Sequence, residues 1–196
     1  MQHQSRKLVC MRAWTRLLVS LAAIPCMVWP GLVSPIRATT LEQLTLDDMI
    51  QKSTAIVRAR VTGSHSSYRG ADIYTFFQLQ VLETWKASGR VTTDVAIPGG
   101  VVNGIRQRVT GAPDLKAGQE YVLFLWTSRS GLSQVMGLSQ GLFKVSEEGS
   151  GGAVAQRPPA PELMLDRSGS PVEDAPVSMR LQDLRARVIH AVAAAR

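Results

Sequence analysis

Cysteine is almost missing from this 196-residue sequence, since its two cysteines, Cys10 and Cys26, both lie within the first 38 residues. From Thr39 onward the chain has no thiol that could form a disulfide, bind a metal or act as a nucleophile. Histidine is also scarce, with only His65 and His190 after residue 38. Two imidazoles are too few for a zinc site with three nitrogen or sulfur ligands, so we expect no metal and no cofactor.

Acidic residues are absent from the first 38 positions, which nevertheless contain five of the 22 basic residues. Without this leader the chain has 17 basic and 15 acidic residues, and its net charge falls from +7 to +2. A strongly basic protein would suggest nucleic acid as a partner. Because the excess charge belongs to the leader, we expect no nucleic-acid partner for the rest of the chain.

The leader has the order of residues that is typical of a secretory signal peptide. Four basic residues precede an apolar stretch over residues 17–33, and Ala38 is a small residue suited to the cut site. We expect cleavage near Ala38 and a mature domain in the periplasm or outside the cell. The alternative is an uncleaved membrane anchor, because about 20 apolar residues span a bilayer. Pro25, Pro30 and Gly31 make this stretch a poor spanning helix.

Alternation of apolar and polar residues predicts a mainly β fold for the mature chain. A short helix is expected at residues 45–53, because Thr45 can cap its first turn. A polar turn is expected at residues 65–72. The expected strands are, in chain order, residues 56–64, 73–85, 91–97, 104–110, 120–126, 135–136, 142–145 and 153–157. The second of these is longer than a usual strand and should bend.

The run YVLFLW, residues 121–126, is apolar on both faces and therefore predicts a central strand. Apolar residues on this strand and on the long strand before it should share one core. These residues are Phe77, Leu79, Val81, Leu123 and Leu125.

The C-terminal part of the sequence changes its pattern twice. Five prolines between Arg157 and Pro176 indicate an irregular surface connector. Apolar residues then recur at three- and four-residue spacing, which predicts an amphipathic helix. The expected organisation is a signal peptide at 1–38, a barrel domain at 39–148, a hairpin and proline-rich connector at 149–176, and a C-terminal helix packing on the barrel at 177–196.

Several short strands with one helix before and one helix after them favour a small antiparallel OB-like barrel. The strings TAIVRARVTGS, LQVLETWKAS and LKAGQEYVLFL, between Ser53 and Val145, resemble the OB-like barrels of netrin-type modules and tissue inhibitors of metalloproteinases. The resemblance implies a fold. The N-terminal cysteine and the disulfides of those inhibitors have no counterpart after residue 38, so it does not imply their activity. The layout is also similar to that of a group of exported bacterial proteins, which implies no function.

One short motif raises the alternative of an enzyme. Residues 137–141 read GLSQG and fit G-x-S-x-G, with Asp166 and His190 downstream in the serine, acid, histidine order of α/β-hydrolases. A nucleophile elbow needs a helix after its serine, whereas the residues after Ser139 read as a strand. We expect a structural glycine turn and no enzyme, with a serine hydrolase that uses Ser139 as the alternative.

A second alternative is a single-stranded nucleic-acid-binding OB fold. The residues Arg58, Arg60, Arg106 and Arg108 could form a basic stripe next to aromatic side chains. Because the mature chain is nearly neutral, solvated strand faces are the expected role of these arginines.

The segment 98–113 contains four glycines and is longer than a hairpin requires. Since loops carry function more often than cores do, a binding site is expected here and at the GLSQG turn. The binding candidates are Asn103, Arg106, Arg108, Ser139 and Gln140. The expected function is that of an exported, non-enzymatic domain that binds a protein or another envelope component. It would touch a membrane only through an uncleaved leader.

Overall fold

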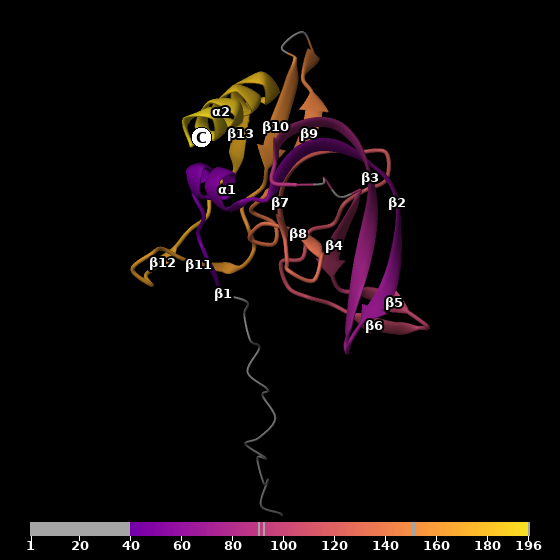
Figure 1. Ribbon diagram of the computed structural model, residues 1–196. Helices are drawn as coiled ribbons and strands as arrows, with labels where there is room; N and C mark the ends of the chain where they lie inside the picture. The colour runs from indigo at the N-terminus through magenta and orange to yellow at the C-terminus, as the bar shows by residue number, and fades with distance from the viewer. Residues whose placement is uncertain (1–39, 90, 92, 150–151, 196) are drawn as a thin grey trace, which may run out of the picture. The chain divides into compact units, whose positions relative to one another are not determined.

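The protein is mainly β in the computed structural model, which describes residues 40–89, 91, 93–149 and 152–195 (Figure 1). The predicted signal peptide at 1–38 lies outside these residues. The elements are, in chain order, β1 (Thr40–Glu42), α1 (Leu46–Lys52), β2 (Ala55–Arg69), β3 (Asp72–Ala87), β4 (Asp94–Pro98), β5 (Gly100–Val102), β6 (Ile105–Gln107), β7 (Glu120–Thr127), β8 (Ser133–Val135), β9 (Leu142–Glu147), β10 (Ala153–Arg157), β11 (Leu163–Leu165), β12 (Pro171–Val172), β13 (Val177–Arg180) and α2 (Leu181–Ala194).

Most strands of the described residues belong to one eight-stranded sheet, in the order β13-β10-β9-β7-β2-β3-β4, with β8 beside β7. All neighbours in this sheet run antiparallel. A separate antiparallel hairpin consists of β5 and β6, and a third sheet pairs β1 in parallel with β11 and β11 with β12. The expectation of a mainly β, largely antiparallel structure is confirmed.

The strands β2 and β3 form one long, curved hairpin. Their pairing shifts register at three places, and such irregularities bend a strand pair, as the curved ribbons of β2 and β3 show in Figure 1. The predicted polar turn at 65–72 is wrong, because β2 continues to Arg69 and only Gly70 and Ala71 turn the chain. Pairing with β3 along the whole length satisfies the backbone of this polar stretch, and His65 stacks on Phe76.

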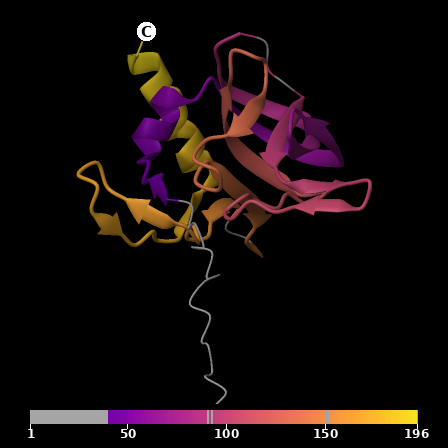
Figure 2. The ribbon, with the colours of Figure 1, turned by 90° about the horizontal axis from the view of Figure 1, so that it is seen from below.

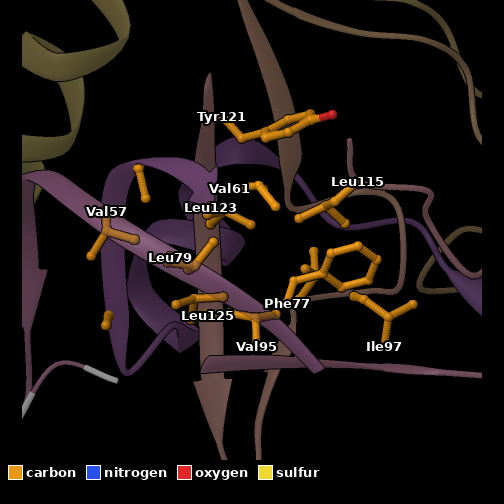
Figure 3. Packing of buried hydrophobic residues seen from close by; sticks show 13 residues of the cluster. Val57, Val61, Phe77, Leu79, Val95, Ile97, Leu115, Tyr121, Leu123 and Leu125 are labelled. Carbon is orange, nitrogen blue, oxygen red and sulfur yellow. The ribbon is translucent and has the colours of Figure 1, made fainter. Parts of the chain in front are cut away.

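Strand β7 separates two hydrophobic cores, as its apolar pattern on both faces predicts. One face contributes Tyr121, Leu123 and Leu125 to the first core, which lies between β2, β3, β4, β7 and β8 (Figure 3). The predicted core is confirmed, since Phe77, Leu79, Leu123 and Leu125 are buried in it and Val81 packs against it.

The other face of β7 belongs to a second core, which α1 and α2 cover. Here the rings of Phe124 and Phe143 lie 5.6 Å apart. The helices add buried side chains at Met49, Ile50, Leu181, Leu184 and Val188. The sequence around Thr45 starts α1 through a capping box, in which Thr45 accepts from the backbone of Asp48 and the Asp48 carboxylate accepts from that of Thr45. Neither helix of the described ranges is long and apolar enough to cross a membrane.

The C-terminal part contains more β structure than its prolines suggested. The connector is not irregular throughout, because 163–165 and 171–172 form β11 and β12. The helix expected from residue 177 begins only at Leu181, because 177–180 pair with β10 as β13. A segment that lies next to an open sheet edge gains backbone hydrogen bonds by pairing with that edge. The spacing of apolar residues along the segment does not predict this pairing.

Candidate functional site

The segment 98–113 is built around the hairpin of β5 and β6. Asn103 and Gly104 have φ angles of 49° and 80° and form its turn, which is the role that an Asn-Gly pair usually has in a two-residue hairpin. Of the candidate residues here, Arg106 lies on β6 and Arg108 follows it, and both side chains are exposed.

The hairpin is held against the far end of β2 and β3. Gly100, at φ 145°, lies so close to Ser66 and Thr75 that a Cβ at this position would be 2.6 Å from each hydroxyl oxygen. Thr75 Oγ1 donates to the Gly99 carbonyl at 2.8 Å, and the Gln107 side chain accepts from the backbone N–H of Ile73 at 2.7 Å. No local signal in the sequence marks Gln107 as a functional residue, because its partner is 34 residues away.

Another glycine of this segment, Gly111, faces the buried side chain of Glu162. A Cβ on Gly111 would overlap the Glu162 carboxylate, and the φ angle of Gly111 is +79°. Gly118 has the same φ but open space around it. We expect Gly118→Ala to cost about 1 kcal/mol through backbone strain alone. Gly111→Ala should cost about 1 to 3 kcal/mol more, the usual cost of overpacking.

Chemical denaturation would test this by measuring the free energy of unfolding of four proteins. They are Gly111→Ala, Gly118→Ala, Glu162→Ala and the double variant with Gly111→Ala and Glu162→Ala. The overlap should disappear when Glu162 is truncated, so Gly111→Ala should then cost only as much as Gly118→Ala. Equal costs for Gly111→Ala and Gly118→Ala in the presence of Glu162 would mean that the carboxylate moves aside freely.

The GLSQG turn lies between β8 and β9, and its geometry differs from a nucleophile elbow. Gly137 and Leu138 have φ angles of 59° and 55°, whereas Ser139 is not among the described residues with positive φ. The Ser139 hydroxyl is buried and has no hydrogen-bond partner in the described part of the chain. It is therefore bonded neither to His190, which is exposed on α2, nor to Asp166, whose carboxylate accepts hydrogen bonds within the β11–β12 turn.

The neighbouring candidate, Gln140, serves as a clamp on the N-terminal segment. Its side chain is buried, accepts from the backbone N–H of Leu44 at 2.8 Å and donates to the Glu42 carbonyl at 3.0 Å. Both amide atoms are thus satisfied by the protein, and Gln140 has a structural contact where the sequence suggested binding.

Replacing Ser139 by alanine should leave folding unchanged within about 0.5 kcal/mol, because it removes a hydroxyl without a partner. Gly141→Ala, by contrast, should destabilise the protein, since its Cβ would lie 2.9 Å from the Met136 carbonyl oxygen and 3.1 Å from Phe124 Cβ. Thermal denaturation separates these effects, and an esterase and peptidase screen of Ser139→Ala addresses catalysis. A hydrolytic activity that the Ser139 and His190 variants both lose would reverse this interpretation.

The four arginines do not form one basic stripe. Arg58 and Arg60 lie on β2 and both bind Glu120, at 2.8 and 2.5 Å, whereas Arg106 belongs to the separate β5–β6 hairpin. Arg58 also bridges to Glu83 at 2.9 Å. The expectation that Arg58 is merely solvated is wrong, because its guanidinium joins carboxylates from β3 and β7.

The arginine bridges change the ionisation of both glutamates. A hydrogen bond from Trp85, helped by Arg58 and Arg185, lowers the pKa of Glu83 despite its partial burial. Desolvation alone would raise the pKa of Glu120, but the hydrogen bonds and charges of Arg58 and Arg60 together lower it. A carboxylate with a lowered pKa stabilises the fold above its unfolded pKa, and this stabilisation is lost as the pH falls through its folded pKa.

We therefore expect the free energy of unfolding to decrease below about pH 4.5, the ordinary glutamate pKa. Arg58→Met should cost about 1 kcal/mol at pH 7, because these side chains are partly solvated. Its cost should decrease as the pH is lowered from 7 toward 3, because the glutamates become protonated as the pH falls through their lowered folded pKa values. Urea denaturation at both pH values measures the difference, with Gln78→Ala as an exposed, uncharged control. An equal cost at both pH values would show that the bridges contribute nothing.

Both ends of segment 98–113 meet the GLSQG turn around a small pocket of about 160 Å³. Its lining includes Ile97, Pro98, Pro113, Trp126, Met136 and Leu138. Trp126, the last aromatic residue of β7, remains 45 % exposed. The pocket lies where β4 and β8 approach each other, and it brings together the two segments for which the sequence predicts a binding site. The candidates Asn103, Arg106, Arg108, Ser139 and Gln140 do not line it.

Among the described residues, no group of three or more histidine, aspartate, glutamate or cysteine side chains is placed to hold a metal ion. In comparisons with known proteins, no family model and no curated protein matches the chain.

Proposed function

We propose that the protein is an exported, non-enzymatic binding domain of OB-like β-barrel type, whose ligand is an apolar side chain of another envelope protein. The observation that carries this proposal is the pocket beside Trp126. An exposed tryptophan next to an apolar cavity is the usual surrounding of an anchor residue in a protein interface. The volume of about 160 Å³ is of the size of one large apolar side chain.

The barrel part of the proposal is supported by the curvature of the sheet around the first core. Strands β2, β3, β4, β7 and β8 surround this core, and β4 and β8 lie close together at the two ends of the curve. Loops at such a place are held by a rigid scaffold, which suits a binding site. Export is supported by the basic leader, its apolar stretch and the small residue Ala38.

Photocrosslinking in cells that export the full chain tests the proposed site. The photoreactive amino acid p-benzoylphenylalanine would be placed at position 126, with position 189 on α2 as the control. Ile189 is also partly exposed, at 41 %, but lies on a different element. The proposal expects a protein adduct of one size from position 126 and none from position 189.

The crosslinked protein would then be purified and its affinity measured. Trp126→Ala should weaken binding at least about tenfold, the effect of a buried anchor, whereas Ile189→Ala should not change it. Equal adducts from both positions, or an affinity that is unchanged in Trp126→Ala, would exclude the pocket as the binding site.

A further inference from the structure

The tip of the β5–β6 hairpin consists of the Asn103–Gly104 turn and the strand residues beside it, which are apolar although they are surrounded by solvent. Val101 is 47 % exposed and Ile105 is 59 % exposed, while Val102 is half-buried. The hairpin projects from the rest of the described chain in both ribbon views (Figures 1 and 2). Exposed β-branched apolar residues that gather on a projecting turn are a feature of interaction sites.

The apolar side chains lie on both faces of the hairpin. Val102 pairs with Ile105 and Val101 pairs with Arg106. Directly paired residues share a face and successive residues alternate, so Val101 lies on the face opposite Val102 and Ile105. A shallow groove on a partner protein would cover only one face of the hairpin, whereas the apolar layer of a membrane would surround both faces.

Basic side chains lie around the base of this tip. Arg106 and Arg108 follow Ile105 and are exposed. Arg108 directly follows β6 and is three residues from Ile105, which corresponds to roughly 10 Å at about 3.3 Å per extended residue. This is comparable to the depth of about 5 to 10 Å to which interfacial segments enter a bilayer. Arg108 would therefore lie at the level of lipid headgroups when the tip is buried. Arg106 pairs with Val101 and lies at its depth, so only its long side chain would reach the headgroups.

The neighbouring hairpin of β2 and β3 adds to the same surface. Tyr68 is 44 % exposed and pairs with Ile73, whose backbone is bonded to Gln107 on β6. Arg69 donates to Ser130, which places it beside the turn that contains the exposed Arg129. Arg106 and Arg108 bring the arginines named at this end to four, and the carboxylate of Asp72 there accepts a hydrogen bond from Gln107.

The base of the tip is held by contacts with the neighbouring strands. Its two-residue turn leaves no loop to order, and the contacts of Gly100 and Gln107 hold its base on β2 and β3. A preorganised element loses little conformational freedom on binding.

We propose that the β5–β6 tip inserts Val101, Val102 and Ile105 into the interfacial layer of an anionic phospholipid membrane, with the surrounding arginines on the headgroup phosphates. This contact goes beyond the expectation that only an uncleaved leader touches a membrane. It is separate from the protein ligand proposed for the Trp126 pocket.

Fluorescence of a labelled full chain tests the insertion at the tip itself. Cys10→Ser and Cys26→Ser remove the native thiols, and Val101→Cys carries the environment-sensitive dye NBD. Gln182→Cys, on the exposed face of α2, carries the control label. The vesicles consist of phosphatidylcholine alone or of phosphatidylcholine mixed with phosphatidylglycerol. Every protein has the same leader, so the leader's contribution to vesicle affinity is the same for both labelled proteins.

The expected result is a blue shift and an intensity increase of the label at position 101 with anionic vesicles, with little change at position 182. Replacing Arg106 and Arg108 by glutamine should weaken vesicle affinity about fivefold per arginine. The matched control, Arg180→Gln with Arg187→Gln, removes two charges from elsewhere and should have a smaller effect. Ile105→Ser should reduce the signal, and Ile189→Ser should not.

An unchanged label at position 101, or equal changes at positions 101 and 182, would overturn the proposal. A second outcome would also overturn the membrane proposal. If variants at Arg106, Arg108 or Ile105 kept their vesicle affinity but lost the photocrosslinked protein adduct at position 126, the tip would belong to a protein interface. The vesicle result leaves the Trp126 pocket untouched, so the two proposals can fail separately.

Discussion

Replacing Asp174 by alanine should lower the free energy of unfolding by about 3 to 5 kcal/mol, the usual cost of removing one partner of a buried ion pair. The Arg157 and Asp174 side chains are only 7 % and 4 % exposed. The guanidinium binds both carboxylate oxygens, at 2.5 and 3.0 Å, and the Ala160 backbone N–H donates to the same carboxylate. Without Asp174 the arginine remains buried without a counter-charge.

Urea denaturation of a variant cycle measures this effect. Arg157→Met combined with Asp174→Ala should be more stable than Asp174→Ala alone, because it removes the unpaired charge along with its partner. Desolvation raises the pKa of Asp174, but Arg157 and the Ala160 N–H lower it overall. The pair therefore stabilises the fold above the unfolded aspartate pKa and loses this effect as the pH falls. A cost below about 1 kcal/mol for Asp174→Ala would indicate that water reaches Arg157.

The second large effect is expected on the two faces of β7. Leu123→Ala should cost about 2 to 5 kcal/mol and Phe124→Ala about 3 to 5 kcal/mol, since both side chains are fully buried. The leucine belongs to the first core and the phenylalanine to the second. Each substitution removes apolar contacts and leaves a cavity in a different layer.

Chemical denaturation of both variants distinguishes the two core layers. The control is Gln78→Ala at an exposed position, which should change the free energy of unfolding by no more than about 0.5 kcal/mol. A small cost for Phe124→Ala alone would mean that α1 and α2 are only loosely packed on the sheet. A small cost for Leu123→Ala would contradict the packing of the first core in Figure 3.

Features that depend on neighbouring residues could be recognised in the sequence. The apolar pattern of residues 121–126 predicted a central strand with both faces buried, and Thr45 at the start of 45–53 predicted the cap of α1. The glycines of GLSQG predicted a turn, in which Gly137 has a positive φ angle, whereas the second positive φ belongs to Leu138 and not to Gly141. In each case hydrogen bonds or side-chain periodicity within a few residues determine the conformation.

The roles of the binding candidates depend on contacts between residues that are far apart in the sequence. Gln140 was a reasonable polar candidate in a glycine turn, but its side chain is bonded to the backbone of Leu44, 96 residues earlier. Trp126 became part of a pocket because Pro98, Pro113 and Leu138 arrive there from three different segments. The spacing of residues within one segment does not predict which distant segments will come into contact with it.

By itself, the sequence determined the central strand at 121–126, its two buried faces and the leader's charge pattern, because these follow from the order of side chains along a short stretch. Only the tertiary structure decided that residues 65–69 extend β2, that 177–180 form β13, and that Arg157 meets Asp174. The physical reason is that strand pairing and buried ion pairs depend on partners far away in the chain. Their free energy arises only after the intervening loops are closed.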